Sequence, residues 1–234
     1  MKNLLLTGGL GFIGTNLQSK LENYNVKIID IKSGDNILTC SLPDNIDCVI
    51  HLAALAGVRT SFTKAQDYWE TNVIGTRRIL DAYPNARCLV ASSSNAAYPY
   101  SNPYAMSKYT AESIPHDNKL DMRFTTVYGE DSREGMFFEK LKNNTLEYTT
   151  DHIRDFIHVE DLCSIISSLL TVTTKGTIGI GTGVGVKVSD LAPHLPVTKG
   201  EDYEVKDNTN EFKWPYCKTV WEFLEDTTWN DKKY

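Results

Sequence analysis

The stretch NLLLTGGLGFIGTNL, residues 3–17, decides the fold class of this chain. A run of leucines comes first, as in a strand that is buried on both faces. Four glycines follow within the seven positions 8–14, and apolar residues then recur at close to helical spacing. A strand therefore passes through a glycine-rich turn into a helix. Because glycine loses more backbone entropy than other residues on folding, this turn must need either unusual backbone angles or missing side chains.

The glycines of the turn have the spacing of a dinucleotide-binding motif. Gly8, Gly11 and Gly14 are three apart, with Gly9 in addition. In such a unit the first glycine allows a tight turn, the second leaves room for a pyrophosphate, and the third lets helix and strand pack closely. The helix N-terminus then attracts the phosphates. We therefore predict a dinucleotide site whose first residues are Gly8, Gly11, Phe12, Ile13 and Gly14.

Asp30 ends the next predicted strand, residues 25–30. An acid at this position accepts hydrogen bonds from the ribose hydroxyls of NAD and repels the 2′-phosphate of NADP. The alternative is a simple turn aspartate, and Lys32 lies nearby. NAD is the predicted cofactor, and we expect it to bind more tightly than NADP.

Strands and helices alternate along most of the chain. The patterns predict strands at 3–7, 25–30, 48–54, 87–94, 122–129 and 176–181, and helices at 12–22, 65–83, 104–113 and 158–170. The tail after about residue 182 is polar and irregular, with a late helix near 220–226. This alternation predicts an α/β fold with a doubly wound parallel sheet.

Composition limits the class of protein. The 234 residues include 41% hydrophobic and 23% charged residues, and a net charge of -6 argues against a nucleic-acid surface. No segment reaches the ~18 apolar residues of a membrane span, and the first residues are too few for a signal-peptide core. Five cysteines without CxxC pairing predict free thiols and a cytoplasmic location. Five scattered histidines predict no metal site.

The segment YAMSK places Tyr104 and Lys108 four residues apart, on one face of a helix. An ammonium beside a phenol favours the phenolate, which can take a proton from a sugar hydroxyl while hydride leaves the same carbon. The upstream strand ends in three serines, and Ser94 can hydrogen-bond the substrate oxygen. The alternatives are an ordinary surface pair and a polar strand end.

Six motifs together resemble one known family. TGGLGFIG, HLAALAGVR, TNVIGT, SSSNAAY, YAMSK and RDFIHVEDL occur in the order seen in extended short-chain dehydrogenases/reductases that act on nucleotide sugars. The resemblance runs from residue 3 to about 190. It implies a Rossmann-type NAD-binding domain at 1–128, with 152–181 returning to it, and a small C-terminal substrate-binding lobe at 129–151 and 182–234.

The resemblance also implies roles for single residues. Tyr104, Lys108 and Ser94 match the catalytic positions of the family. Arg154 matches an arginine that meets the substrate diphosphate, and Arg59 and Ser93 are further expected substrate contacts. Besides the glycine turn, Tyr104 and Lys108, the positions that line the cofactor site are Asp30, Ile31, Leu52, Ala53, Ala54 and Asn72. For Asn72, a helix-anchoring amide is an equally good interpretation.

The residues after Ser94 favour one reaction over the others. Dehydratases of this family carry Asp-Glu directly after the catalytic Ser or Thr, whereas Asn95 and Ala96 stand here. The glutamate that decarboxylases place near the same spot is also missing. Epimerisation at C4, by oxidation and re-reduction, is therefore expected. A decarboxylase, a 4-keto reductase and a non-catalytic NAD-binding regulator are the alternatives.

Two stretches indicate the substrate. AGVRTS (56–61) and RFTTVYGEDSREGMFF (123–138) resemble UDP-glucuronate 4-epimerases. Thr126 and Arg133 then match residues that hold the C5 carboxylate, which would discourage loss of CO2 from the 4-keto sugar. UDP-glucuronate and UDP-galacturonate are favoured, with UDP-glucose, UDP-galactose or their N-acetyl analogues next. The resemblance also implies a homodimer, although the Tyr104 helix stops early at Pro115.

Overall fold

The computed structural model describes residues 1–130, 132, 135–200, 204 and 207–226, and the chain divides into two compact units. Unit 1 comprises Met1–Arg123 and Cys163–Ile178, and unit 2 comprises Phe124–Leu162 and Gly179–Tyr234. The sequence placed these boundaries after residues 128, 151 and 181. The difference has a physical reason, because residues 126–128 pair with residues 156–158 as neighbouring strands. The substrate-binding role of the C-terminal lobe stays a prediction.

Unit 1 is built on a six-stranded sheet with the order β2-β1-β3-β4-β5-β9. Strand β1 pairs in parallel with β2 and β3, and β3 pairs in parallel with β4. The predicted α/β fold with a doubly wound sheet is confirmed. The strands are β1 (Lys2–Thr7), β2 (Tyr24–Ile29), β3 (Cys48–His51), β4 (Arg87–Ser93), β5 (Lys119–Phe124) and β9 (Gly176–Ile180).

The strand order runs outward from β1 in both directions, so it reverses beside β1. Open parallel sheets bind their ligands at the carboxyl ends of the strands where the order reverses. Here β1 ends at Thr7, just before the glycine turn, and β3 ends at His51, just before Leu52. Strand β3 is shorter than the predicted 48–54, because the chain leaves the sheet there to form a loop toward the glycine turn.

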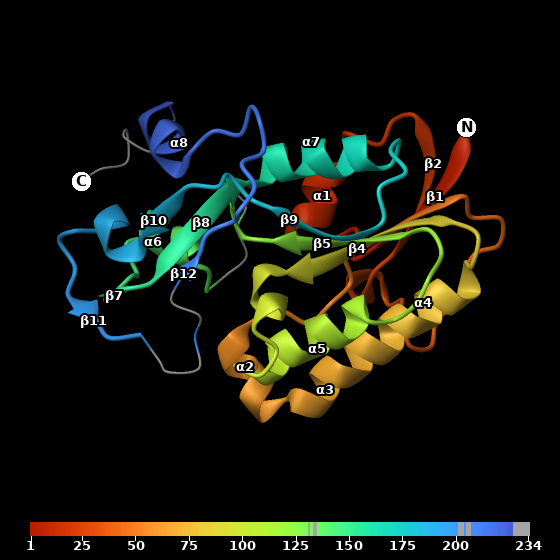
Figure 1. Ribbon diagram of the computed structural model, residues 1–234, viewed down its shortest axis with the longest axis horizontal. Helices are drawn as coiled ribbons and strands as arrows, with labels where there is room; N and C mark the ends of the chain where they lie inside the picture. The colour runs from red at the N-terminus through yellow and green to blue at the C-terminus, as the bar shows by residue number, and fades with distance from the viewer. Residues whose placement is uncertain (131, 133–134, 201–203, 205–206, 227–234) are drawn as a thin grey trace. The chain divides into compact units, whose positions relative to one another are not determined.

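Helices cover both faces of this sheet (Figure 1). On one face lie α1 (Phe12–Gln18), which is shorter than the predicted 12–22, and α7 (Val159–Leu169). The Ser167 hydroxyl of α7 donates to the Lys20 carbonyl just after α1, at 3.1 Å. The other face carries α3 (Ala65–Trp69), α4 (Thr76–Ala82) and α5 (Pro103–Glu112), with the short α2 (Val58–Thr63) nearby.

The predicted helix 65–83 is continuous, but its centre is wound differently. Residues Glu70–Gly75 form a π-helical segment, η2, between α3 and α4. Such turns are rare and often occur at functional sites. Asn72 lies inside η2, so a candidate cofactor residue stands on the irregular turn. Apolar periodicity does not reveal such a turn, because the spacing of neighbouring apolar residues stays close to that of an α-helix.

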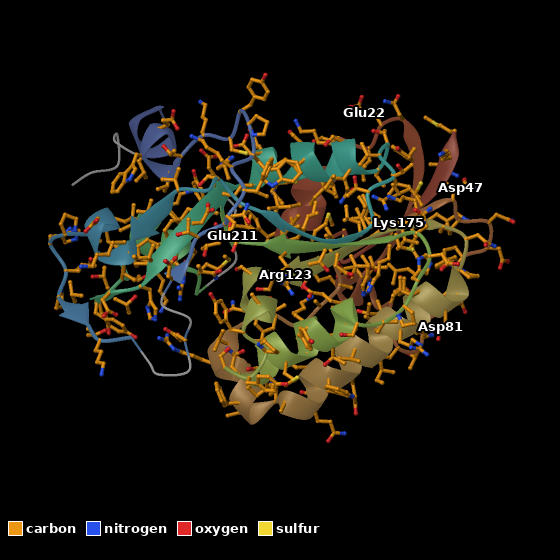
Figure 2. All side chains as sticks on the ribbon, in the orientation of Figure 1. Glu22, Asp47, Asp81, Arg123, Lys175 and Glu211 are labelled. Carbon is orange, nitrogen blue, oxygen red and sulfur yellow. The ribbon has the colours of Figure 1, made fainter. Side chains whose placement is uncertain are left out.

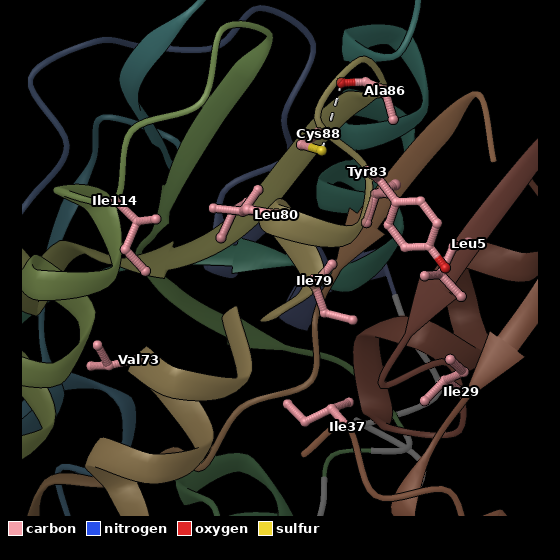
Figure 3. Close-up of a cluster of buried hydrophobic side chains, with 12 residues drawn as sticks. Leu5, Ile29, Ile37, Val73, Ile79, Leu80, Tyr83, Ala86, Cys88 and Ile114 are labelled. Carbon is pink, nitrogen blue, oxygen red and sulfur yellow. Dashed lines mark hydrogen bonds between the residues drawn. The ribbon is translucent and has the colours of Figure 1, made fainter. Parts of the chain in front are cut away.

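One hydrophobic core cluster of unit 1 lies between the sheet and α4 (Figure 3). Leu5, Val49 and Cys88 contribute from the strands, and Ile79 and Leu80 from α4. All five expose 2% or less of their surface. Charged side chains such as Glu22, Asp81 and Lys175 lie at the surface instead (Figure 2).

The segment between β2 and β3 is held in place by contacts with α4. It contains the 3-10 turn η1 (Ile31–Ser33), and Ile37 then packs into the core. The Arg78 guanidinium of α4 donates to the carbonyls of Ile37 and Cys40, both at 2.6 Å. A Cβ at Gly75, the glycine of TNVIGT, would lie 2.6 Å from Ile37 Cδ1. The missing side chain therefore leaves room for Ile37 to pack against the helix.

Unit 2 is organised around one strand, β8 (Ile153–His158). Its first residues pair with β10 (Gly185–Lys187) and β12 (Asp207–Asn208), and its last three pair with β6 (Thr126–Tyr128). The polar tail expected to be irregular therefore supplies short strands. The other elements are β7 (Thr149–Thr150), β11 (Val197–Thr198), α6 (Phe137–Lys142), the 3-10 turn η4 (Val188–Leu191) and α8 (Val220–Asp226).

A buried carboxylate ties the tail to β8. Asp155 is fully buried and accepts four hydrogen bonds at 2.7–3.1 Å, two from Thr182 and one each from the backbone N–H groups of Gly183 and Asn210. Buried ionised groups are stable only when hydrogen-bonded in this way.

Among the described residues, no helix combines the length and apolar character needed to cross a bilayer.

We predict that Asp155→Asn lowers the free energy of unfolding by about 2–4 kcal/mol, because an amide nitrogen would face N–H donors and lose the charge-assisted bonds. Urea unfolding at pH 7 measures this. Asp207→Asn is the matched control, since the exposed Asp207 carboxylate accepts from Thr209 N at 3.1 Å. Equal effects of the two substitutions would contradict the role given to Asp155.

Candidate active site

The structure shows why Gly8 and Gly14 of the turn are glycines. Gly8 has φ +71°, and a Cβ there would lie 2.7 Å from Ala53 N. A Cβ at Gly14 would collide with Gly8 O and lie 2.7 Å from Gly9 Cα. The third glycine thus lets α1 pack against the turn itself. Backbone geometry and packing require glycine at both positions.

The backbone angles of Gly11 do not require glycine. Its φ of -79° and ψ of 173° suit any residue. A Cβ there would make a tight contact of 3.2 Å with Gly8 O, but no other described heavy atom outside the adjacent residues would lie within 4 Å. The missing side chain therefore leaves open space beside the turn, as close approach of a pyrophosphate requires. The residues present fit a dinucleotide.

Asp30 is 5% exposed and anchors the same turn. Its two carboxylate oxygens accept from Leu10 N at 2.9 Å and Lys32 N at 2.8 Å. The turn role is therefore real, and each oxygen keeps acceptor capacity for a ribose hydroxyl. The Lys32 ammonium donates to Leu10 O at 2.8 Å, while the neighbouring Ile31 is 68% exposed.

The loop after β3 is held from two sides. Leu52 N donates to Thr7 O at 3.0 Å, and Ala53 N donates to Thr7 Oγ1 at 3.3 Å; Ala54 follows. On the other side, the Asn72 amide binds both backbone groups of Leu55, at 2.8 and 3.0 Å. These contacts fix the loop that the sequence assigns to the cofactor site.

The Asn72 side chain also reaches α5. Its Nδ2 donates to Ser107 Oγ at 3.0 Å, and the Ser107 hydroxyl donates to Tyr104 O at 2.8 Å. Both amide hydrogens are thus used inside the protein. The anchoring interpretation of Asn72 holds in the structure, and its contact with the cofactor stays a prediction.

Helix α5 presents the Tyr–Lys pair. Asn102 caps it, accepting from Ala105 N at 2.8 Å, and Pro103 occupies its first turn. The buried Lys108 ammonium donates to Ala91 O of β4 at 2.9 Å. Burial lowers the pKa of Lys108 to about 8, against the opposing pull of Glu112 and Asp121. Lys108 is therefore still mostly charged at neutral pH.

The three serines at the end of β4 have different surroundings. The Ser92 hydroxyl donates to the Glu112 carboxylate at 2.5 Å. The same carboxylate accepts two hydrogen bonds from the Arg123 guanidinium, at 2.6 and 2.8 Å. Ser93 Oγ accepts from Asn95 N at 3.2 Å and caps the turn η3 (Ser94–Ala97). Ser94 is half-buried at the start of η3, and its contact with the substrate stays a prediction.

The predicted substrate residues are spread over both units. Arg59 is exposed on α2 of unit 1. Thr126 on β6 and Arg154 on β8 are half-buried in unit 2, and Arg154 donates to Ile153 O at 3.1 Å. Burial lowers the pKa of Arg154. Arg133 lies outside the described residues, so its role stays a prediction.

Sequence reasoning missed two residues beside this site. The Tyr68 hydroxyl contacts Ala56 O and Gly57 O at 3.0 and 2.9 Å, and its ring meets Tyr104 edge-on with centroids 6.1 Å apart. His51 is buried between Thr7 and Thr76. The spacing of Tyr68 and Asn72, four residues apart on one helix face, was the available signal for the first.

Comparison with known proteins identifies the family. Residues 4–181 match the NAD dependent epimerase/dehydratase family, and the chain belongs to it, with NAD as its cofactor. A putative UDP-glucose 4-epimerase of Methanocaldococcus jannaschii is 30% identical, over 80% of this chain and 79% of the relative.

Solved structures show the same similarity. MoeE5 in complex with UDP-glucose and NAD is 29% identical, with a TM-score of 0.74 over 89% of each chain. The same protein was also solved with UDP-glucuronic acid and NAD. The UDP-glucuronic acid 4-epimerase of Bacillus cereus is 22% identical, with a TM-score of 0.74 over 90% of each chain, which shows the shared fold.

We predict that His51 makes stability depend on pH. Burial, followed by the Lys108 charge, lowers the pKa of His51 from 6.5 to about 3. Between these values the unfolded chain binds a proton that the folded chain does not, so stability falls as pH falls below 6.5. The wild-type protein should lose about 2 kcal/mol more than His51→Gln between pH 7 and pH 5, measured by urea unfolding. Parallel curves would contradict this.

Proposed function

We propose that this protein is a nucleotide-sugar 4-epimerase that oxidises and re-reduces C4 of a UDP-sugar, with UDP-glucuronate and UDP-galacturonate as the favoured pair. The observation that carries the proposal is the arrangement at the end of β4. Lys108 of α5 binds Ala91 O, and Ser94 follows three residues later in the same chain segment. Tyr104 is one helical turn before Lys108.

The proposed chemistry divides between the cofactor and the protein. NAD, when bound, supplies a reversible hydride acceptor for C4. The Tyr104 phenolate takes the proton of the 4-hydroxyl during oxidation and returns it to the same oxygen during reduction, while Ser94 hydrogen-bonds that oxygen. The Lys108 charge favours the phenolate. No net proton or electron leaves the cycle.

The sequence after Ser94 supports epimerisation over dehydration. Asn95 reaches Ser93 Oγ at 3.4 Å, and Ala96 is fully buried in η3. Neither residue can act as the acid that elimination of water needs. The family includes both activities, so this pair of residues is what favours an epimerase.

The choice of UDP-glucuronate rests on Thr126, Arg133 and the resemblance of their flanking sequence. UDP-glucose is the second candidate substrate, because the Methanocaldococcus jannaschii relative and one MoeE5 complex carry its name. A cytoplasmic homodimer remains the expected form. Its interface would cover exposed aromatic side chains on the helices of unit 1: Phe62 of α2 (47% exposed), Trp69 of α3 (43%) and Tyr109 of α5 (44%).

The substrate is tested by incubating the protein with NAD and UDP-glucuronate and resolving the products by NMR. We expect UDP-galacturonate without net NADH. A UDP-pentose or its 4-keto form would identify a decarboxylase instead. No reaction, with turnover of UDP-glucose, would assign the second candidate and leave Arg133 without a carboxylate to bind.

Tyr104 is tested by Tyr104→Phe, which removes the phenolic oxygen and keeps the ring. We predict a fall in kcat of roughly 10³-fold with nearly unchanged NAD binding, because general acid–base catalysis is lost. Tyr109→Phe is the control, since Tyr109 lies on the same helix and is 44% exposed. Normal turnover by Tyr104→Phe would refute the mechanism.

A further inference from the structure

We infer that His51 is a positioning residue of the cofactor site, which holds the loop 52–55 to η2 through a hydrogen-bond chain of one fixed direction. The inference rests on the proposed placement of NAD against Ala53. His51 is the last residue of β3 and is 2% exposed, so it cannot itself reach a ligand freely.

The chain has five members, all inside unit 1. Ala53 N lies 3.3 Å from Thr7 Oγ1, which lies 2.6 Å from His51 Nδ1. On the other side of the ring, His51 Nε2 lies 3.0 Å from Thr76 Oγ1, which lies 2.7 Å from Asn72 O. The chain therefore joins the loop after β3 to the π-helical turn.

Only one placement of protons satisfies every contact. A carbonyl only accepts, so the single Thr76 hydroxyl proton points to Asn72 O. His51 Nε2 must then be the donor to Thr76 Oγ1. A neutral ring with Nε2–H has Nδ1 as its acceptor, so the Thr7 hydroxyl donates to Nδ1. Thr7 Oγ1 in turn accepts from Ala53 N.

Each of the two other states of the ring is disfavoured for its own reason. With the proton on Nδ1, the lone pair of Nε2 would face Thr76 Oγ1, whose proton is already used. A doubly protonated ring would bury a charge near the Lys108 ammonium. Burial without a compensating anion strongly disfavours that charge.

The position of the loop matters for the cofactor site because the loop touches the glycine turn. A Cβ at Gly8 would lie 2.7 Å from Ala53 N, so the two backbones are already in close contact. Loosening Ala53 would shift the wall beside the turn. Asn72 accepts the last hydrogen bond of the series, and its side chain holds Leu55 of the same loop.

The tautomer is measured first, on the wild-type protein. Long-range ¹H–¹⁵N correlation spectra of histidine-labelled protein distinguish Nε2–H from Nδ1–H. We expect His51 as the neutral Nε2–H form at pH 7, with or without NAD. An Nδ1–H or doubly protonated ring would overturn the inference.

The positioning role is measured with Thr76→Val and a matched control, Thr110→Val. Each substitution removes a hydroxyl that donates to the carbonyl four residues earlier. Thr110 takes no part in the series of hydrogen bonds through His51. We expect Thr76→Val to weaken NADH binding about tenfold and to speed amide exchange at Ala53, with no such changes in Thr110→Val.

Equal effects of the two substitutions would overturn the inference. If Thr76→Val does not fold, the tautomer measurement on the wild type still decides the direction of the chain. Neither measurement uses a sugar substrate, so failure of the proposed epimerase activity would leave both results interpretable.

Discussion

The close approach of two backbone segments, the glycine turn and the loop after β3, is the constraint on which the site in unit 1 depends. Gly8 and Ala53 meet so tightly that a single Cβ between them would collide. This contact is possible because β1 and β3 are neighbours at the point where the strand order reverses. Beside this contact, Gly11 keeps the turn free of a side chain, as close approach of a pyrophosphate requires.

Buried polar groups hold this arrangement in place. Asp30 ties the turn to the end of β2, and Asn72 ties the loop to α5. Each of these groups has a structural task that can be read directly from its partners. The proposed catalytic group, Tyr104, instead stands half-buried beside Tyr68 on a capped helix. Of these groups, Asn72 is linked to Tyr104 through the Ser107 hydroxyl.

The sequence predicted the elements whose signals are local. Glycine spacing located the turn, and apolar runs located the strands of unit 1, because a buried parallel strand needs a continuous apolar stretch. The π-helical turn, the loop at Ile37, β8 and the short strands of the tail escaped prediction. They depend on distant partners, such as Asp155 for residues 182–210, which no periodicity encodes. The roles of Asp30 and Asn72 needed the observed contacts.

The most direct test of the account follows a deuterium label at C4 of the UDP-sugar. Mass spectrometry and NMR would locate the label after reaction in the presence of excess unlabelled NAD. The account predicts that deuterium remains at C4 of the epimer, with none in solvent or in the free cofactor pool. Loss of the label to either would contradict oxidation and re-reduction of the same carbon within one binding event.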